Sequence, residues 1–248
     1  MNILKSTFGF LWLLWAAFCF MLIVSPLTLV FALILVIGGK KYSMRCVWFN
    51  CHVVSPLLLK LMLIKLEIYG SEKVNDKDTY VFVSNHLSQI DVISNASAVP
   101  QPMRFLAKAE IKYIPFFGFM VKMIGIVVDR SSKESREKSF RNMADALNKK
   151  ECLFIYPEGT RNRTDQPLKE FKDGAFRVAI MAQVPIAAQT LVGTRELNNP
   201  NGFQLYPGTV KIYWSEPIPT KGMTIDDVPA LKEKVKAQMM EHLQKRNT

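Results

Sequence analysis

The sequence predicts an α/β fold, with a mixed, largely parallel sheet flanked by helices and an N-terminal apolar helical membrane anchor. Two observations support this prediction. Short apolar runs with strand character alternate with helical patterns from residue 80 onward, as in chains built from βα units. Residues 6–39 contain no charged side chain. We therefore divide the chain into membrane-anchoring helices over residues 1–69 and an α/β domain over residues 70–248.

Composition narrows the classes of partner. The formal net charge is +11 at pH 7, which suits either nucleic acid or an anionic membrane surface. The apolar N-terminus favours the membrane, because the sequence has neither a basic low-complexity tail nor a recognisable nucleic-acid-binding motif. Four cysteines lie in apolar surroundings without CxxC spacing, so we expect neither a metal site nor a disulfide framework.

The first segment, residues 6–39, is long for a membrane span. As one helix it would reach about 51 Å, whereas the hydrocarbon core is about 30 Å thick. Ser25-Pro26 interrupts the run, so either a long tilted span with a proline kink or a helical hairpin entering one leaflet fits. Lys40 and Lys41 follow the segment, against Lys5 before it. This asymmetry predicts that the downstream domain lies on the cytoplasmic side, which in a bacterium is the inner membrane's inner face.

A second apolar segment covers residues 42–69. Its lysines, Lys60 and Lys65, are compatible with an interfacial helix whose lysine stems extend toward lipid headgroups. An ordinary buried helix fits equally well. Residues 70–78 form a polar turn region, after which we expect the α/β domain to begin.

Within that domain the pattern alternates. Strands are predicted at residues 80–84, 103–107, 124–128, 152–156, 186–192 and 209–214. Helices are predicted at residues 89–98, 115–123 and 174–183, with one opening at the capping-box pair Ser131 and Glu134 and a last amphipathic one beginning at Asp226. In such a sheet we expect the active site outside one strand edge.

One candidate catalytic pair follows the first of these strands. His86 stands five residues before Asp91, after the turn residues Ser84 and Asn85. If His86 lies in the turn and Asp91 in the first helical turn, the carboxylate can fix the imidazole tautomer and leave the other nitrogen free as a general base. A polar turn followed by a capped helix explains the same residues without catalysis.

Cationic side chains follow three other predicted strands. Arg161 and Arg163 lie in the loop after residues 152–156, and Arg130 follows residues 124–128. Lys108 follows residues 103–107. Each alone is explained as a surface charge. Together, beside a candidate base, they indicate a site for an anionic acceptor at a membrane face.

The motifs that contain these residues resemble those of the 1-acyl-sn-glycerol-3-phosphate acyltransferases, in the glycerolipid acyltransferase family. Residues 85–91 (NHLSQID) match that family's NHxxxxD block, and residues 125–130 (GIVVDR) match its GxxxxR block. Residues 156–161 (YPEGTR) match FPEGTR, and residues 184–186 match VPI. The resemblance covers residues 70–220. It departs where Tyr156 replaces phenylalanine and Asn162 stands where serine is common, which affects acyl or acceptor preference more than the reaction.

The resemblance implies a reaction and a set of roles. His86 would deprotonate the sn-2 hydroxyl of a lysophosphatidate, with Asp91 orienting it. The alkoxide would attack acyl-coenzyme A or acyl-carrier protein directly, giving phosphatidic acid without an acyl-enzyme; no GxSxG motif is present. No cofactor is implied. The implied substrate-binding residues are Lys108, Arg130, Glu158, Gly159, Thr160 and Arg161.

Other functions remain open from the sequence. The same His–Asp pair can activate water on a thioester, which would make the protein a hydrolase. An acyltransferase for glycerol 3-phosphate or another lysophospholipid fits the same motifs. A non-catalytic membrane-binding protein is disfavoured, because His86 and Asp91 are both present.

Overall fold

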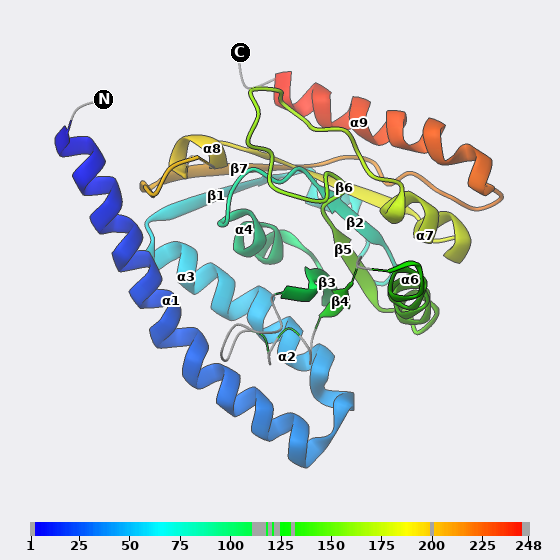
Figure 1. The fold of residues 1–248 in the computed structure, drawn as a ribbon, viewed down its shortest axis with the longest axis horizontal. Coiled ribbons are helices and arrows are strands. Elements are labelled where there is room, and N and C mark those ends of the chain that lie inside the picture. Colours follow the sequence, from blue (N-terminus) through cyan, green and yellow to red (C-terminus); the bar gives the residue numbers. More distant parts are fainter. Residues whose placement is uncertain are drawn as a thin grey trace.

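One sheet organises the computed structural model, which describes residues 3–110, 118, 121, 125–129, 132–198 and 201–244. In this part of the chain seven strands pair in the order β1-β7-β6-β2-β5-β3-β4 (Figure 1). Neighbouring strands are parallel except β6 and β7, so the predicted mixed, largely parallel sheet is confirmed. The strands are β1 (Ile64–Tyr69), β2 (Val81–Ser84), β3 (Met103–Lys108), β4 (Ile126–Val128), β5 (Cys152–Ile155), β6 (Ile186–Val192) and β7 (Gly208–Trp214).

Helices cover both faces of the sheet (Figure 1). One face carries α6 (Lys133–Asn148), α7 (Gly174–Ala182) and α9 (Val228–Gln244). The other carries α2 (Ser43–Phe49), α3 (Ser55–Leu61) and α4 (Asp91–Ala98). In β2, Val81 and Val83 pack in the cluster of the first face and Phe82 in a cluster of the second. This alternation explains why the central strands are apolar throughout instead of alternating with polar residues.

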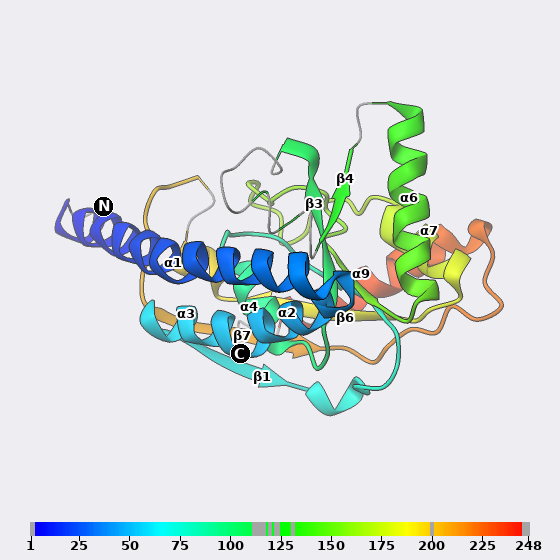
Figure 2. The same ribbon diagram turned by 90° about the horizontal axis from the view of Figure 1, so that it is seen from below.

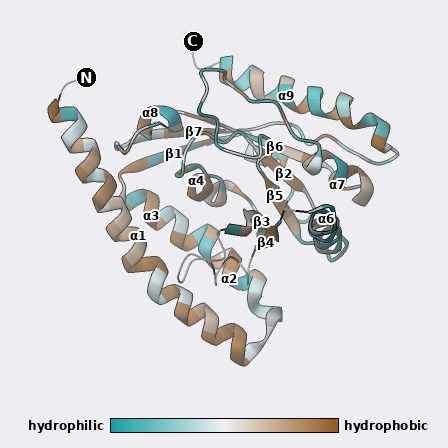
Figure 3. Cartoon of the chain, viewed as in Figure 1, coloured by the Kyte–Doolittle hydropathy of each residue, from teal (hydrophilic) through white to brown (hydrophobic). Residues whose placement is uncertain are grey.

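The first helix, α1 (Ile3–Gly38), is continuous through Pro26. The hairpin alternative for residues 6–39 is therefore wrong. Its buried residues form one stripe, whereas most of its other apolar side chains are exposed. Figure 3 shows that hydrophobic residues recur along the whole helix. Among the described residues it is the one helix long and apolar enough to cross a membrane.

The following helices run back along α1 (Figure 2). Trp12 near the start of α1 donates its indole N–H to the carbonyl of Met62, and Phe31 near its end packs edge-on against Phe49. A π-helical turn, Asn50–Val54, joins α2 to α3. The hairpin in this protein is thus made by α1 with the α2–α3 segment, and lies beside the sheet.

The predicted helix over residues 42–69 ends earlier than expected, because β1 begins at Ile64. Leu63 has a positive φ of 51°, which ends the helical path. From Ile64 the sequence alternates apolar and charged residues, and β1 pairs in register with β7. Lys65 is therefore a strand residue that forms an ion pair with Glu67 at 2.9 Å, whereas Lys60 is exposed on α3.

Two helix starts differ from the predictions. Ser132 caps α6 by accepting the N–H of Ser135, where Ser131 was expected. Thr224 and Asp227 form a capping box before α9, and Asp226 lies in that turn instead of in the helix. The predicted strands of the α/β domain are otherwise found within two residues of their expected ends. The predicted helix over residues 115–123 lies outside the described residues apart from two positions.

Candidate active site

The motifs that contain His86 and Arg161 reach the same edge of the sheet, whereas Ile186 of the VPI motif begins β6 at the opposite end, where it pairs with Val81. β2, β5, β3 and β4 are adjacent and parallel, so their carboxyl ends lie on the same side. His86 follows β2, Arg161 follows β5, and the backbone of Lys108 ends β3 opposite Val128 of β4. Arg130 lies outside the described residues, two positions beyond the end of β4.

Asn85 fixes the end of β2. Its side-chain oxygen accepts the N–H of Leu191 at 2.8 Å, and its side-chain N–H donates to the carbonyl of Leu191 at 2.9 Å. The side chain is fully buried and extends the pairing of β2 with β6 by one step beyond Ser84. The chain therefore leaves the sheet at a fixed position immediately before His86.

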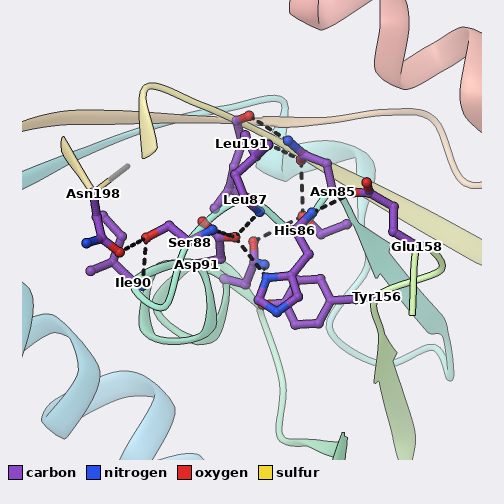
Figure 4. Close-up of polar contacts among 12 residues, drawn as sticks. Asn85, His86, Leu87, Ser88, Ile90, Asp91, Tyr156, Glu158, Leu191 and Asn198 are labelled. Atoms are coloured by element: carbon purple, nitrogen blue, oxygen red, sulfur yellow. Dashed lines mark hydrogen bonds and ion pairs between the residues drawn. The ribbon is translucent and has the colours of Figure 1, made fainter. Parts of the chain in front are cut away.

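His86 and Asp91 are in direct contact, as the sequence predicted (Figure 4). The imidazole Nδ1 lies 2.9 Å from Asp91 Oδ2, which also accepts the N–H groups of Leu87 at 2.6 Å and Ser88 at 2.7 Å. Asp91 is fully buried in the first turn of α4, where the helix dipole favours a carboxylate. The His86 side chain is 17% exposed, and its Nε2 makes no hydrogen bond with a described residue.

The loop after β5 holds the backbone of His86 from the other side. Glu158 Oε1 accepts the N–H of His86 at 2.8 Å and Oε2 accepts the N–H of Lys169 at 2.9 Å. The N–H of Asn162 donates to the carbonyl of His86 at 2.6 Å. Burial raises the pKa of the Glu158 carboxyl, and the two backbone N–H groups oppose this shift. Both Glu158 oxygens are thus engaged in fixing the loops.

Tyr156 covers one face of the imidazole. The two rings are stacked with centroids 4.0 Å apart and planes inclined by 16°. The Tyr156 hydroxyl accepts the side-chain N–H of Asn95 at 2.9 Å, which ties the ring to α4. Burial and the nearby Asp91 carboxylate raise the phenol pKa well above its usual range, while the Asn95 bond lowers it. The hydroxyl therefore stays protonated.

The remaining predicted substrate-binding residues lie around the turn after β5. Gly159 has a positive φ of 73°, which glycine adopts without strain, and its N–H donates to the carbonyl of Tyr156. Thr160 Oγ1 accepts a hydrogen bond from Lys169 Nζ at 2.8 Å. Within the described part of the chain, the Arg161 guanidinium has no hydrogen-bond or ion-pair partner. Arg161 is thus the cation of this group with its donors available for an anion.

Three contributors to this arrangement that lie outside the four motifs were not predicted as site residues. Asn95 stands four positions after Asp91, so both lie on one face of α4, and this spacing is a usable signal. Asn162 holds the loop after Arg161, since its side chain bonds both Gln166 and Thr164. Asn198 accepts a hydrogen bond from Ser88 across 110 positions, which no local pattern indicates.

The geometry suits proton transfer. One imidazole nitrogen bonds a buried carboxylate and the other is accessible, which is the arrangement of a general base. No group of three or more His, Cys, Asp or Glu side chains within the described residues could hold a metal ion.

Sequence comparison identifies relatives with named activities. The acyltransferase family model matches residues 65–191, slightly more than half of the chain. A 1-acyl-sn-glycerol-3-phosphate acyltransferase of Saccharomyces cerevisiae is 29% identical over 211 residues, 83% of this chain and 68% of that protein. The human alpha form of that enzyme is 29% identical over 199 residues, 76% of this chain and 70% of that protein.

A Caenorhabditis elegans protein provisionally named for the same activity is 34% identical over 176 residues, 70% of this chain. This chain spans 62% of the length of that relative. The crystal structure of the 1-acyl-sn-glycerophosphate (LPA) acyltransferase PlsC from Thermotoga maritima has a similar fold, with a TM-score of 0.79 at 19% identity. The similarity covers 100% of this chain and 98% of that one. The match to the family model shows that the chain belongs to the acyltransferase family.

Proposed function

We propose that this protein transfers a fatty acyl group from an acyl thioester to the sn-2 hydroxyl of 1-acylglycerol 3-phosphate, giving phosphatidic acid. The observation that carries the proposal is the contact of His86 Nδ1 with the buried Asp91, at the strand edge where Arg161 also lies. Membership of the acyltransferase family supports the reaction type, and the yeast and human relatives named above support the acceptor.

The reaction follows from the orientation of His86. Asp91 accepts a hydrogen bond from the protonated Nδ1, so Nε2 carries the lone pair that removes the proton of the acceptor hydroxyl. The oxygen attacks the thioester carbonyl, a C–O bond forms, and the C–S bond breaks. The imidazolium then returns the proton to the leaving thiolate. Asp91 lowers the energy of the imidazolium between these two steps, and no acyl-enzyme is required.

The acceptor phosphate would be bound by cations at the same strand edge. Arg161 presents a planar guanidinium that suits two phosphate oxygens. Lys108 and Arg130 are assigned to the same phosphate by their motifs, together with the turn formed by Gly159 and Thr160. Glu158 acts here through the backbone of His86. Holding the phosphate positions the hydroxyl at Nε2, which replaces a bimolecular encounter by a positioned one.

The membrane would be the source of the lysolipid acceptor. α1 has an exposed apolar surface that includes Ile3 and Leu4, each about four-fifths exposed, and a composition suited to a bilayer. We assign the catalytic domain to the cytoplasmic side, where coenzyme A and acyl-carrier protein thioesters are found. Neither donor requires a cofactor or metal in this mechanism.

A panel of acceptors tests the proposal. The purified full-length protein in lipid nanodiscs is given acyl-coenzyme A or acyl-carrier protein with lysophosphatidate, glycerol 3-phosphate or uncharged lysolipids, and products are identified by mass. We expect phosphatidic acid from lysophosphatidate, and no product from His86→Ala. A preference for another acceptor, or release of fatty acid without any acceptor, would overturn the assignment.

Arg161→Ala tests the phosphate contact separately. The KM for lysophosphatidate should rise about tenfold or more, because a charge-assisted bidentate contact is lost. Turnover of an uncharged lysolipid should not change. An equal effect on both acceptors would contradict the phosphate assignment.

A further inference from the structure

Besides Glu158 and Asn162, a third residue distant in the sequence holds the catalytic loop, and it does so at Ser88. Ser88 lies between His86 and Asp91, and its N–H is one of the donors to Asp91 Oδ2. Its hydroxyl accepts the N–H of Ile90 at 3.2 Å and donates to Asn198 Oδ1 at 2.7 Å (Figure 4). Ser88 is fully buried, so this bond is shielded from water. Asn198 is thus placed to determine where Ser88, and with it the Asp91 carboxylate, lies.

Asn198 is itself fixed on its second side. It follows the short helix α8 (Thr194–Leu197), and its side-chain N–H donates to the carbonyl of Gln204 at 2.8 Å. With the amide nitrogen engaged there, the amide oxygen must face Ser88. Asn198 is 8% exposed as a residue, so its side chain has little freedom to turn away.

The segment that holds Asn198 is bound to the N-terminal end of α1. The N–H of Leu205 donates to the carbonyl of Gly9 at 3.0 Å, and the Gln204 amide donates to Ser6 Oγ at 3.2 Å. The Tyr206 hydroxyl donates to the carbonyl of Lys5 at 3.2 Å. Three hydrogen bonds thus join the start of α1 to residues 204–206, which lie about 200 positions later in the sequence.

Apolar packing accompanies these hydrogen bonds. Leu205, Leu197 and Ile90 belong to one buried cluster, and Trp12 of α1 packs against it. Gly9 permits the close approach, since a Cβ at this position would lie 2.5 Å from the Tyr206 ring. The start of α1, the loop before β7 and the catalytic loop therefore pack as one unit.

We propose that Asn198 is a positioning residue that couples the N-terminal end of α1 to the catalytic loop. The contacts of α1 with residues 204–206 hold Asn198, Asn198 holds Ser88, and Ser88 holds the Asp91 carboxylate against His86. Displacement of the start of α1 would then loosen the catalytic pair. The activity readout of this proposal rests on the proposed acyl transfer, whereas the exchange readout below does not.

Paired glycine variants test the α1 end of the link. Gly9→Ala would drive the Tyr206 ring away from α1. Gly38→Ala makes the same change at the other end of the same helix, where the Cβ would meet the ring of Tyr42. We expect Gly9→Ala to lower kcat about tenfold with unchanged membrane binding and little change in KM, and Gly38→Ala to behave as wild type. The double variant Gly9→Ala/Tyr206→Ala removes the clash and should recover part of the loss.

Asn198→Ala and Ser88→Ala test the other end. Each should lower kcat about tenfold, and the loss in the double variant should be clearly smaller than the product of the two single losses, because both variants remove the bond between Ser88 and Asn198. Ser88→Ala also removes the bond from the N–H of Ile90, and Asn198→Ala also removes the bond to Gln204, so the double variant can lose more than either single variant. Hydrogen exchange gives a readout independent of turnover. The Leu87 and Ser88 amides should exchange faster in Asn198→Ala and Gly9→Ala than in Gly38→Ala.

The outcomes separate the two proposals. Wild-type exchange at residues 87–88 and wild-type kcat in Asn198→Ala would overturn the coupling, as would equal effects of the two glycine variants. Absence of acyl transfer in the wild type would overturn the proposed function, while the exchange measurement would still test the coupling. If Asn198→Ala does not fold, Ser88→Ala and the glycine pair decide the question.

Discussion

His86 is constrained at both its side chain and its backbone. Asp91 fixes rotation of the imidazole through Nδ1, and Tyr156 packs on one ring face. Glu158 and Asn162 bond the N–H and carbonyl of the same residue. The ring is therefore oriented before any substrate binds, which reduces the reorganisation needed at the reaction step.

The Asp91 carboxylate makes a testable contribution. Asp91→Asn removes the negative charge that stabilises the imidazolium. It also places an amide group where the Asp91 Oδ2 oxygen accepts hydrogen bonds from His86, Leu87 and Ser88. We expect kcat to fall roughly 10²–10⁴-fold, the range of a general base, with little change in KM. Steady-state kinetics check this, and Asp91→Asn/His86→Ala should be no worse than His86→Ala alone. An additive double variant would contradict a shared role.

The contributions of the Tyr156 ring and of its hydroxyl to kcat can be measured separately. Tyr156→Phe keeps the stacked ring and removes the hydrogen bond with Asn95, so we expect a loss of kcat of about fivefold or less, since one neutral hydrogen bond contributes about 1 kcal/mol. Tyr156→Leu removes the ring face and should cost about tenfold or more. Asn95→Ala serves as the matched control for the hydroxyl contact and should resemble Tyr156→Phe. Equal losses in Tyr156→Phe and Tyr156→Leu would show that the ring face is unimportant.

Glu158 should affect stability in a pH-dependent way. Its pKa is raised by burial, so above its ordinary value of 4.5 the folded protein binds more protons than the unfolded chain. The free energy of unfolding attributable to Glu158 therefore falls as pH rises from 4.5 through the raised pKa. The Tm of wild type minus that of Glu158→Gln should decrease across this interval. A Tm difference that stays constant across this pH interval would contradict the assignment.

At the scale of single residues, the sequence predicts the pair His86 and Asp91 but not the residues that contact them. The spacing of His86 and Asp91 is local, and a turn followed by a helix brings them together. The stacking of Tyr156 on His86 joins the ends of two strands separated by 70 positions, so it depends on the pairing of β2 with β5. The role of Glu158 was predicted as substrate binding, whereas its two oxygens bond backbone N–H groups.

At the scale of elements, the β2–α4 connection is organised by Asn85. Its two bonds to Leu191 continue the strand ladder where the backbone turns away. The residue is therefore a structural member of a motif whose other two named positions are His86 and Asp91.

Asn85→Ala tests this role. It leaves the buried N–H and carbonyl of Leu191 without partners, which should cost about 2–4 kcal/mol in the free energy of unfolding. Activity should fall as His86 shifts. Asn75→Ala removes an amide contact in an exposed turn and should cost less than about 1 kcal/mol. Denaturant unfolding in detergent measures both, and equal losses would contradict the role.

The boundary between anchor and sheet shows where element prediction failed. Residues 64–69 follow an apolar helix without an intervening polar turn, so composition alone extends the helix to residue 69. Their period-two pattern is short, and only pairing with β7, more than 140 positions later, makes them a strand. The edge position of β1 also explains its charged residues, the exposed Lys65 and the half-buried Glu67.

At the scale of the whole molecule, α1 combines an inward stripe with an outward apolar surface. Leu22 and Leu33 are about 60% exposed in the middle of the helix. The inward stripe holds α1 against α3 and the loop before β7, so the surface that would meet lipid is rigidly attached to the catalytic domain.

Charged substitutions on the outward surface test membrane association. Leu22→Lys/Leu33→Lys should reduce vesicle binding more than about 100-fold, because each lysine is disfavoured by about 3 kcal/mol at a bilayer centre. Ala237→Lys on the exposed face of α9 adds the same charge away from α1 and should leave binding unchanged or slightly stronger. Flotation with vesicles measures this, and full binding by the α1 double variant would contradict the assignment.

The sequence by itself determined the α/β class, most strands and the contact of His86 with Asp91, because these depend on periodicity and on residues close together in the chain. The tertiary structure decided the membership of β1 in the sheet, the stacking of Tyr156 on His86, and the connection of Ser88 through Asn198 to α1. Each of these joins segments far apart in sequence, and their contact depends on strand order and helix packing. Such pairings arise from burial and hydrogen bonding in the folded chain, and no local pattern encodes them.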